Sequence, residues 1–153
     1  MQIKTLLASM LVNETNMRVL HWMVRGKGFQ NAHAKVTSEL YERIRGDIDV
    51  VAEAVLRLDD DAVDYISAVS ILKDSDEDVI IVKADRTYDA KTVYVKVDEI
   101  LGQILELIGK TLASEEIKRS TSVGIKATLE GIYEYYDVQK NYLNKCRLSD
   151  YDD

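Results

Sequence analysis

Apolar residues recur along most of this chain at intervals of three and four, the spacing that places side chains on one face of an α-helix. The clearest such stripe runs through residues 2–24 and predicts a first long helix. Asn13, Glu14 and Asn16 fall off the stripe. His21 borders it, so we expect this side chain to face inward near the end of the helix. The stripe consists of Ile3, Leu6, Leu7, Met10, Leu11, Met17, Leu20 and Val24.

The same period predicts further helices with an irregular segment in the middle of the chain. The helices are expected over residues 31–58, 62–72, 91–112 and 114–146. Around 74–90 the period is lost, because an acidic stretch is followed by the β-branched run Val79–Val82. Such a run indicates a short strand or an irregular insertion that packs on the bundle. Four long helices with a long connection between the second and the third predict an all-α four-helix bundle.

Composition narrows the class of protein further. A chain of 153 residues can bury a full core, and we expect residues 1–153 to form a single domain. The absence of proline favours helices. With 27 acidic and 20 basic residues the formal net charge is −7, which argues against nucleic-acid binding through bulk charge. The single Cys146, the absence of a membrane-spanning apolar run and an N-terminus unlike a signal peptide predict a cytoplasmic protein.

The candidate chemistry lies in the only two histidines and two later carboxylates. His21 and His33 bracket a glycine-bearing turn between the first two predicted helices. Asp49 and Glu53 follow one helical turn apart on the same face. Taken singly, such histidines are more often structural and such carboxylates are typical of a solvated helix face. Together, two imidazoles and two carboxylates are ligand types that suit iron, so these residues predict a metal site.

Two sequence patterns resemble the Dps mini-ferritins. Residues 21–33 carry HWxVxGxxFxxxH, which is similar to the turn between the first two helices of that family. Leu40-Tyr41-Glu42, followed by IDxxAExxLxL over residues 48–58, resembles the rest of the family's second helix. The resemblance implies a ferritin-like four-helix bundle that assembles into a twelve-subunit hollow shell. It also implies oxidation of Fe(II), preferentially by hydrogen peroxide, and storage of the ferric mineral inside.

The resemblance also implies roles for individual residues. In the family the di-iron ferroxidase site lies between two subunits. His21 and His33 are therefore expected from one subunit, and Asp49 and Glu53 from its two-fold partner. Trp22 is expected beside the site, where the family's tryptophan intercepts oxidising equivalents. The partners implied are further copies of the chain, Fe(II) and hydrogen peroxide, with no direct binding to nucleic acid or membrane.

The chain departs from the family pattern at two points. Thr37 stands where the family has a carboxylate, four residues after the second histidine, so one ligand is missing. The gap from His33 to Asp49 is 16 residues, where the family has 15. On a straight α-helix 15 steps leave two side chains about 60° apart, but 16 leave them about 160° apart. A single π-bulge between residues 34 and 40 restores the family facing, and we expect one there.

Two alternative functions remain open from the sequence. Both departures favour a non-catalytic structural or assembly protein of the same fold with a degenerate metal site. A di-metal enzyme acting on an organic substrate is a third class. Bundles of that class use a Glu-x-x-His motif twice, and this chain has no such motif.

Overall fold

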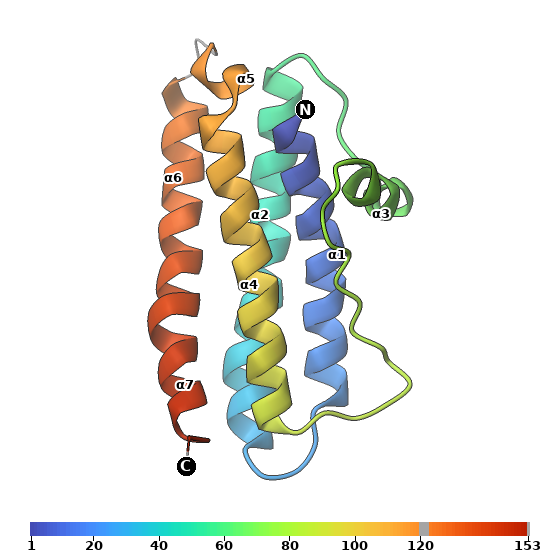
Figure 1. Ribbon diagram of the computed structural model, residues 1–153, viewed down its shortest axis with the longest axis vertical. Helices are drawn as coiled ribbons and strands as arrows, with labels where there is room; N and C mark the ends of the chain where they lie inside the picture. The colour runs from blue at the N-terminus through green and yellow to red at the C-terminus, as the bar shows by residue number, and fades with distance from the viewer. Residues whose placement is uncertain (120–122, 153) are drawn as a thin grey trace.

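The computed structural model describes residues 1–119 and 123–152 and shows long helices that run up and down beside one another (Figure 1). The long elements are α1 (Gln2–Met23), α2 (Ser38–Arg57), α4 (Ala90–Ala113) and α6 (Val123–Val138). Shorter elements are the π-helices η1 (Asn31–Thr37) and η2 (Gln139–Asn144), and the α-helices α3 (Tyr65–Asp74), α5 (Glu115–Lys118) and α7 (Lys145–Ser149). The predicted all-α four-helix bundle, with a long connection between its second and third long helices, is confirmed.

The first three long helices lie close to their predicted bounds, whereas the last one differs. The segment predicted as one helix over 114–146 is divided into α5 and then α6, which continues through η2 to the end of α7. Residues 120–122 of that predicted helix lie outside the described residues. Within the part of the chain that the structure describes, no helix is both long and apolar enough to cross a membrane.

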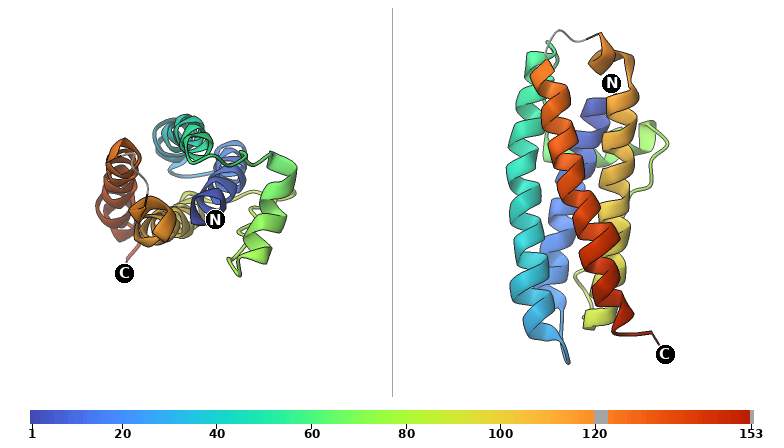
Figure 2. Two further views of the ribbon diagram at one scale, coloured as in Figure 1. Left: turned by 90° about the horizontal axis from the view of Figure 1, so that it is seen from above. Right: turned by 90° about the vertical axis from the view of Figure 1, so that its left-hand side faces the viewer.

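Helix α1 lies at the centre of the molecule and packs against α2, α3 and α4 (Figure 2). Its predicted stripe is buried, apart from the partly buried Leu11. Asn13, Glu14 and Asn16, which fall off that stripe in sequence, are also buried. The reason is that neighbours cover this helix on several sides, so its polar positions also lie inside.

The connection over residues 75–89, here called the strap, crosses the outside of α1 on its way to α4 (Figure 1). It contains no strand, and the isolated bridge between Val24 and Tyr88 pairs its end with the end of α1. The side chain of Asn16 makes the hydrogen bonds to the strap that a neighbouring strand would otherwise make. Its side-chain amide donates to the Ile80 carbonyl (2.7 Å) and accepts from the Val82 N–H (3.0 Å). The irregular insertion expected around 74–90 is therefore a strap fixed to the bundle.

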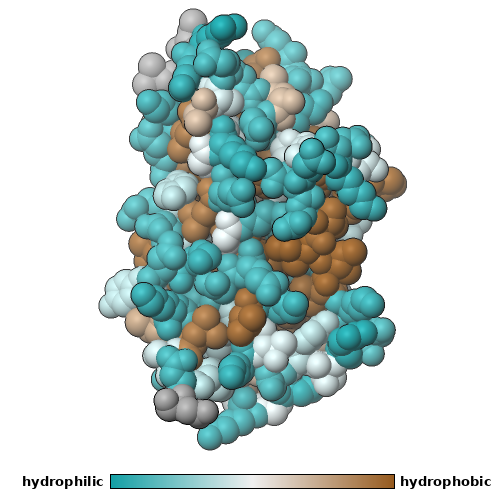
Figure 3. All heavy atoms as spheres, in the orientation of Figure 1, coloured by the Kyte–Doolittle hydropathy of each residue, from teal (hydrophilic) through white to brown (hydrophobic). Residues whose placement is uncertain are grey.

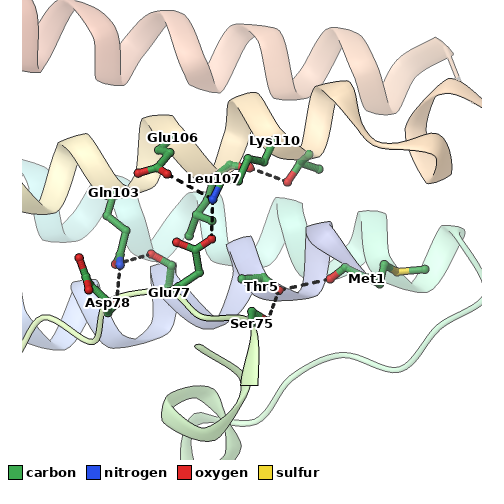
Figure 4. Close-up of polar contacts among 11 residues, drawn as sticks. Met1, Thr5, Ser75, Glu77, Asp78, Gln103, Glu106, Leu107 and Lys110 are labelled. Atoms are coloured by element: carbon green, nitrogen blue, oxygen red, sulfur yellow. Dashed lines mark hydrogen bonds and ion pairs between the residues drawn. The ribbon is translucent and has the colours of Figure 1, made fainter. Parts of the chain in front are cut away.

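A buried chain of polar side chains joins the strap to both α1 and α4. Asn13 donates to Oε1 of Gln103 (2.9 Å), and Gln103 in turn donates to the Asp78 carbonyl (Figure 4). Nearer the start of the strap, Lys110 of α4 pairs with Glu77 (2.7 Å; Figure 4). Buried polar groups need hydrogen-bond partners. Here Asn16 and Gln103 bond backbone groups of the strap, at Ile80, Val82 and Asp78. These side chains therefore explain why polar residues occupy the interior of α1.

Candidate metal centre

The turn between α1 and η1 brings the two histidines together. Gly26 and Gly28 adopt positive φ values of +90° and +86°, a conformation that glycine adopts readily. A Cβ at Gly28 would lie 2.9 Å from Cβ of Ala90, so the turn also needs a residue without a side chain there. The strap closes the turn from outside, because Arg25 N–H donates to the Tyr88 carbonyl (2.8 Å). His21 and His33 consequently lie across the turn from each other.

The second helix contains the π-helical segment that the sequence requires. Residues Asn31–Thr37 are π-helical, and the N–H of Ser38 bonds the carbonyl of His33 five residues earlier. A π turn accommodates one residue more than an α turn. The expected π-bulge is therefore confirmed, beginning three residues earlier than the predicted span of 34–40. It absorbs the extra residue between His33 and Asp49.

The two imidazole rings stack and are locked by each other's backbone. Their centroids are 3.8 Å apart and their planes are inclined by 10°. Nδ1 of His21 lies 2.9 Å from the His33 carbonyl oxygen, and Nδ1 of His33 lies 2.8 Å from the His21 carbonyl oxygen. A carbonyl oxygen only accepts, so each Nδ1 carries the proton. Each Nε2 of the neutral rings therefore keeps a lone pair, the form in which histidine binds metals.

The surroundings of His21 favour the neutral imidazole. Burial and, secondly, the neighbouring His33 ring lower the pKa of His21 below its ordinary value of 6.5. The ring of Phe29 stacks on the other side of His33 at 4.8 Å, and Tyr41 meets His21 edge-on at 5.3 Å. Two guanidinium groups, from Arg18 and Arg45, lie over the ring of Tyr41. The two imidazoles thus lie among aromatic rings, and the nearby guanidinium groups are paired with the carboxylate of Glu14.

Sequence reasoning missed the contacts of Thr37, Phe29 and Tyr41. Thr37 is fully buried, and its Oγ1 lies 3.1 Å from Nδ1 of His21. The spacing from His33 to Thr37 was the available signal, but it indicated only a missing ligand. Phe29 belongs to the family-like motif of residues 21–33, although the motif gives no reason for its stacking. Tyr41 likewise belongs to the family-like stretch Leu40-Tyr41-Glu42, but the sequence gives no reason for its contact with His21.

The other predicted site residues are not gathered with the histidines in one protomer. Asp49 and Glu53 are exposed on α2, and Trp22 is 56% exposed at the end of α1. Among residues 1–119 and 123–152, no cluster of three His, Cys, Asp or Glu side chains could hold a metal ion. The described residues therefore bring the two imidazoles together, whereas the two carboxylates lie apart from them on the solvent-exposed surface of α2.

The sequence matches neither a known family model nor a curated protein. The fold, however, is that of the ferritin-like bundles, and specifically that of Dps proteins. The structure is similar to antigen TpF1 from Treponema pallidum, with a TM-score of 0.82 and 15% identity over 96% of this chain and 88% of that chain. At 15% identity, this likeness establishes the fold alone.

Two Dps structures match at similar levels. Dps from Staphylococcus aureus gives a TM-score of 0.77 and 20% identity over 96% of this chain and 92% of that chain. Dps from Vibrio cholerae gives a TM-score of 0.76 and 23% identity over 94% of this chain and 85% of that chain. The latter belongs to a broad superfamily of ferritin-like diiron-carboxylate proteins. The Dps resemblance inferred from the sequence is thus confirmed at the level of the fold.

Proposed function

We propose that this protein is a Dps-like ferroxidase that oxidises Fe(II) with hydrogen peroxide and stores the ferric product. The observation that carries the proposal is the locked histidine pair. His21 and His33 are held parallel, both with the proton on Nδ1, which leaves the Nε2 lone pair of each ring available to bind a metal. Neutral imidazole nitrogens suit Fe(II), and the lowered pKa of His21 keeps that ring neutral near pH 7.

The site is completed by a second copy of the chain. Asp49 and Glu53 are exposed and one helical turn apart, so both can face a neighbouring protomer. In a two-fold dimer each protomer contributes its histidines to one site and its carboxylates to the other. The carboxylates supply the negative charge that two Fe(II) ions require, which two neutral imidazoles lack.

The reaction transfers one electron from each of two Fe(II) ions to one hydrogen peroxide molecule. Peroxide takes both electrons with two protons, its O–O bond breaks, and two water molecules form. The residues of this chain hold the Fe(II) substrate: His21 and His33 through Nε2, and the partner's Asp49 and Glu53 through oxygen. Trp22 lies next to His21 in sequence and is exposed, so it can intercept oxidising equivalents that escape the site.

Exposed apolar surface supports assembly into a homo-oligomeric shell. Ile66 on α3 is 89% exposed, and Ile81 on the strap is 68% exposed. Figure 3 shows apolar surface gathered beside the strap, below α3. Large apolar side chains left open to water favour association with another surface. We infer self-association, as a shell of twelve copies built from two-fold dimers.

One observation favours a second candidate, a structural bundle of the same fold without ferroxidase activity. Thr37 stands where the resembled family has a carboxylate, and its hydroxyl is turned to the backbone and to His21. A threonine hydroxyl cannot neutralise a metal ion. The non-catalytic candidate predicts no retention of iron, whether the chain is a shell, a dimer or a monomer.

Iron retention separates the two candidates. Fe(II) and hydrogen peroxide are added to the purified protein, which is passed over a sizing column, and iron is counted in the protein peak. A working ferroxidase retains many iron ions per chain in a peak near twelve times the 17.4 kDa of one chain. Iron at the level of a buffer blank, in a protein peak of any size, supports the non-catalytic candidate.

His33→Ala tests the site itself. We expect it to abolish rapid Fe(II) oxidation, whereas Lys35→Ala, an exposed change on the same π-helix, leaves the rate unchanged. Sizing and circular dichroism of both variants show whether the fold and the assembly persist. Oxidation by His33→Ala at the parent rate contradicts the proposed site.

A further inference from the structure

The Thr37 hydroxyl is arranged so that it accepts, rather than donates, toward His21. Its single proton goes to the carbonyl of Ala32, 2.8 Å away, with the His33 carbonyl at 3.2 Å as the second acceptor. Both of those partners are carbonyl oxygens, so the hydroxyl is the donor to them. Nδ1 of His21, 3.1 Å from the same oxygen, must then donate its proton to it. The Nδ1–H is thus shared between Thr37 Oγ1 and the His33 carbonyl.

The π-helix makes this arrangement available. In an α-helix a threonine hydroxyl bonds back to the carbonyl four residues earlier. In η1 the shorter bond reaches Ala32, five residues earlier, as expected of a π turn. The extra residue of this helix and the threonine that replaces a carboxylate therefore occur in one local structure. A carboxylate at position 37 has no proton to give to these carbonyls.

We propose that Thr37 is a positioning residue that fixes the orientation and tautomer of His21. It acts through the imidazole and does not itself contact Fe(II). By accepting from Nδ1–H it adds to the effect of the His33 carbonyl and further disfavours the alternative tautomer, in which the proton occupies Nε2 and blocks the metal-binding lone pair. The inference rests on the proposed function, because it assigns Thr37 its purpose at the same metal site. Thr37 is then not a lost metal ligand. It is a hydrogen-bond partner of a metal-binding histidine, and such partners raise the metal affinity of the histidine.

The test compares Thr37→Val, which removes the hydroxyl at nearly constant size, with Thr37→Ser, which keeps it. In metal-free protein with ¹⁵N-labelled histidine, NMR measures which nitrogen of His21 is protonated and how fast the Nδ1 proton exchanges with water. We expect Thr37→Val to exchange faster and to populate the Nε2–H tautomer, and Thr37→Ser to match the parent. Unchanged exchange and tautomer in Thr37→Val overturn the proposal.

The consequence for metal binding is measured by titrating the protein with Co(II), which is not oxidised in peroxide-free buffer. We expect Thr37→Val to bind it about 10–100-fold more weakly, with Thr37→Ser restoring the parent affinity. A merely structural role would lower the melting temperature and leave both the Nδ1 proton and the affinity of the folded protein unchanged. If Thr37→Val does not fold, Thr37→Ala removes the hydroxyl with less crowding.

The two proposals can fail separately. If the parent binds no Co(II) and retains no iron, the proposed function is wrong, and the NMR measurement on metal-free protein still decides whether Thr37 sets the tautomer of His21. If the parent binds Co(II) and Thr37→Val binds it equally well, the role of Thr37 is wrong and the metal site stands.

Discussion

His21 and His33 each donate a hydrogen bond from Nδ1 to the backbone carbonyl of the other, at 2.9 Å and 2.8 Å. The pair therefore ties the end of α1 to the π-helix η1 and fixes both rings in the absence of any ligand. A binding site that is already ordered loses little conformational entropy when its ligand arrives. In the proposed function, this order means that the histidine half of the metal site is formed before the second protomer supplies the carboxylates.

Complementation between two inactive variants tests whether the site is shared. His33→Ala and Asp49→Asn damage opposite halves of each proposed site, so each alone is expected to lose Fe(II) oxidation. In a co-expressed equal mixture, about a quarter of the sites carry neither change, because a mixed two-fold dimer has one site intact and one doubly altered. Stopped-flow oxidation rates measure the recovery. No recovery in mixed assemblies of full size argues that the four residues lie in one protomer's site or in none.

The free energy of unfolding of the metal-free protein is expected to fall as the pH drops below 6.5. The pKa of His21 is lower in the folded protein than its ordinary value of 6.5, chiefly through burial and then through His33. The unfolded chain therefore binds a proton first, which favours unfolding until the pH passes the folded-state pKa. Urea unfolding in the presence of a chelator measures the slope. His21→Gln should lack this part of it, and parallel curves for parent and variant would contradict the assignment.

Asn16→Ala is expected to loosen the strap and to lower stability by about 2–4 kcal/mol. The change leaves the buried Val82 N–H and the part-buried Ile80 carbonyl without their partner. An unpaired buried group costs about 1–3 kcal/mol, and the part-buried carbonyl lies near the lower end of that range, at about 1 kcal/mol. Hydrogen exchange at the Val82 amide should accelerate, which locates the effect. Asn141→Ala, which removes an exposed bond to Asp137, is the matched control and should stay within about 0.5 kcal/mol.

Two glycine-to-alanine changes are expected to have opposite signs. Gly28→Ala should destabilise by more than about 1 kcal/mol, because the residue has a φ of +86° and a Cβ there meets Ala90 at 2.9 Å. Gly109→Ala should stabilise by about 0.5–1 kcal/mol, since it lies within α4 and a Cβ there meets nothing within 4 Å. Thermal unfolding of both variants measures the difference, and equal effects would refute the close approach at Gly28.

Much of the fold could be predicted because helical periodicity is a local property. Side chains three and four residues apart share a face, so the stripe from Ile3 to Val24 defines α1 without reference to any other segment. The π-helix was predictable for a related reason. One extra residue between His33 and Asp49 rotates everything after it, and only a wider turn can undo that rotation.

Burial and partnership depend on segments that are distant in the chain, and the tertiary structure decided them. Asn13 and Asn16 look like surface residues until the strap and Gln103 are placed against α1. Thr37 looks like a lost ligand until the π-helix turns its hydroxyl between Ala32 and His21. The sequence alone determined the first three long helices, the turn and the two histidines. The tertiary structure decided which polar groups meet, because hydrogen bonds form between atoms that folding brings together.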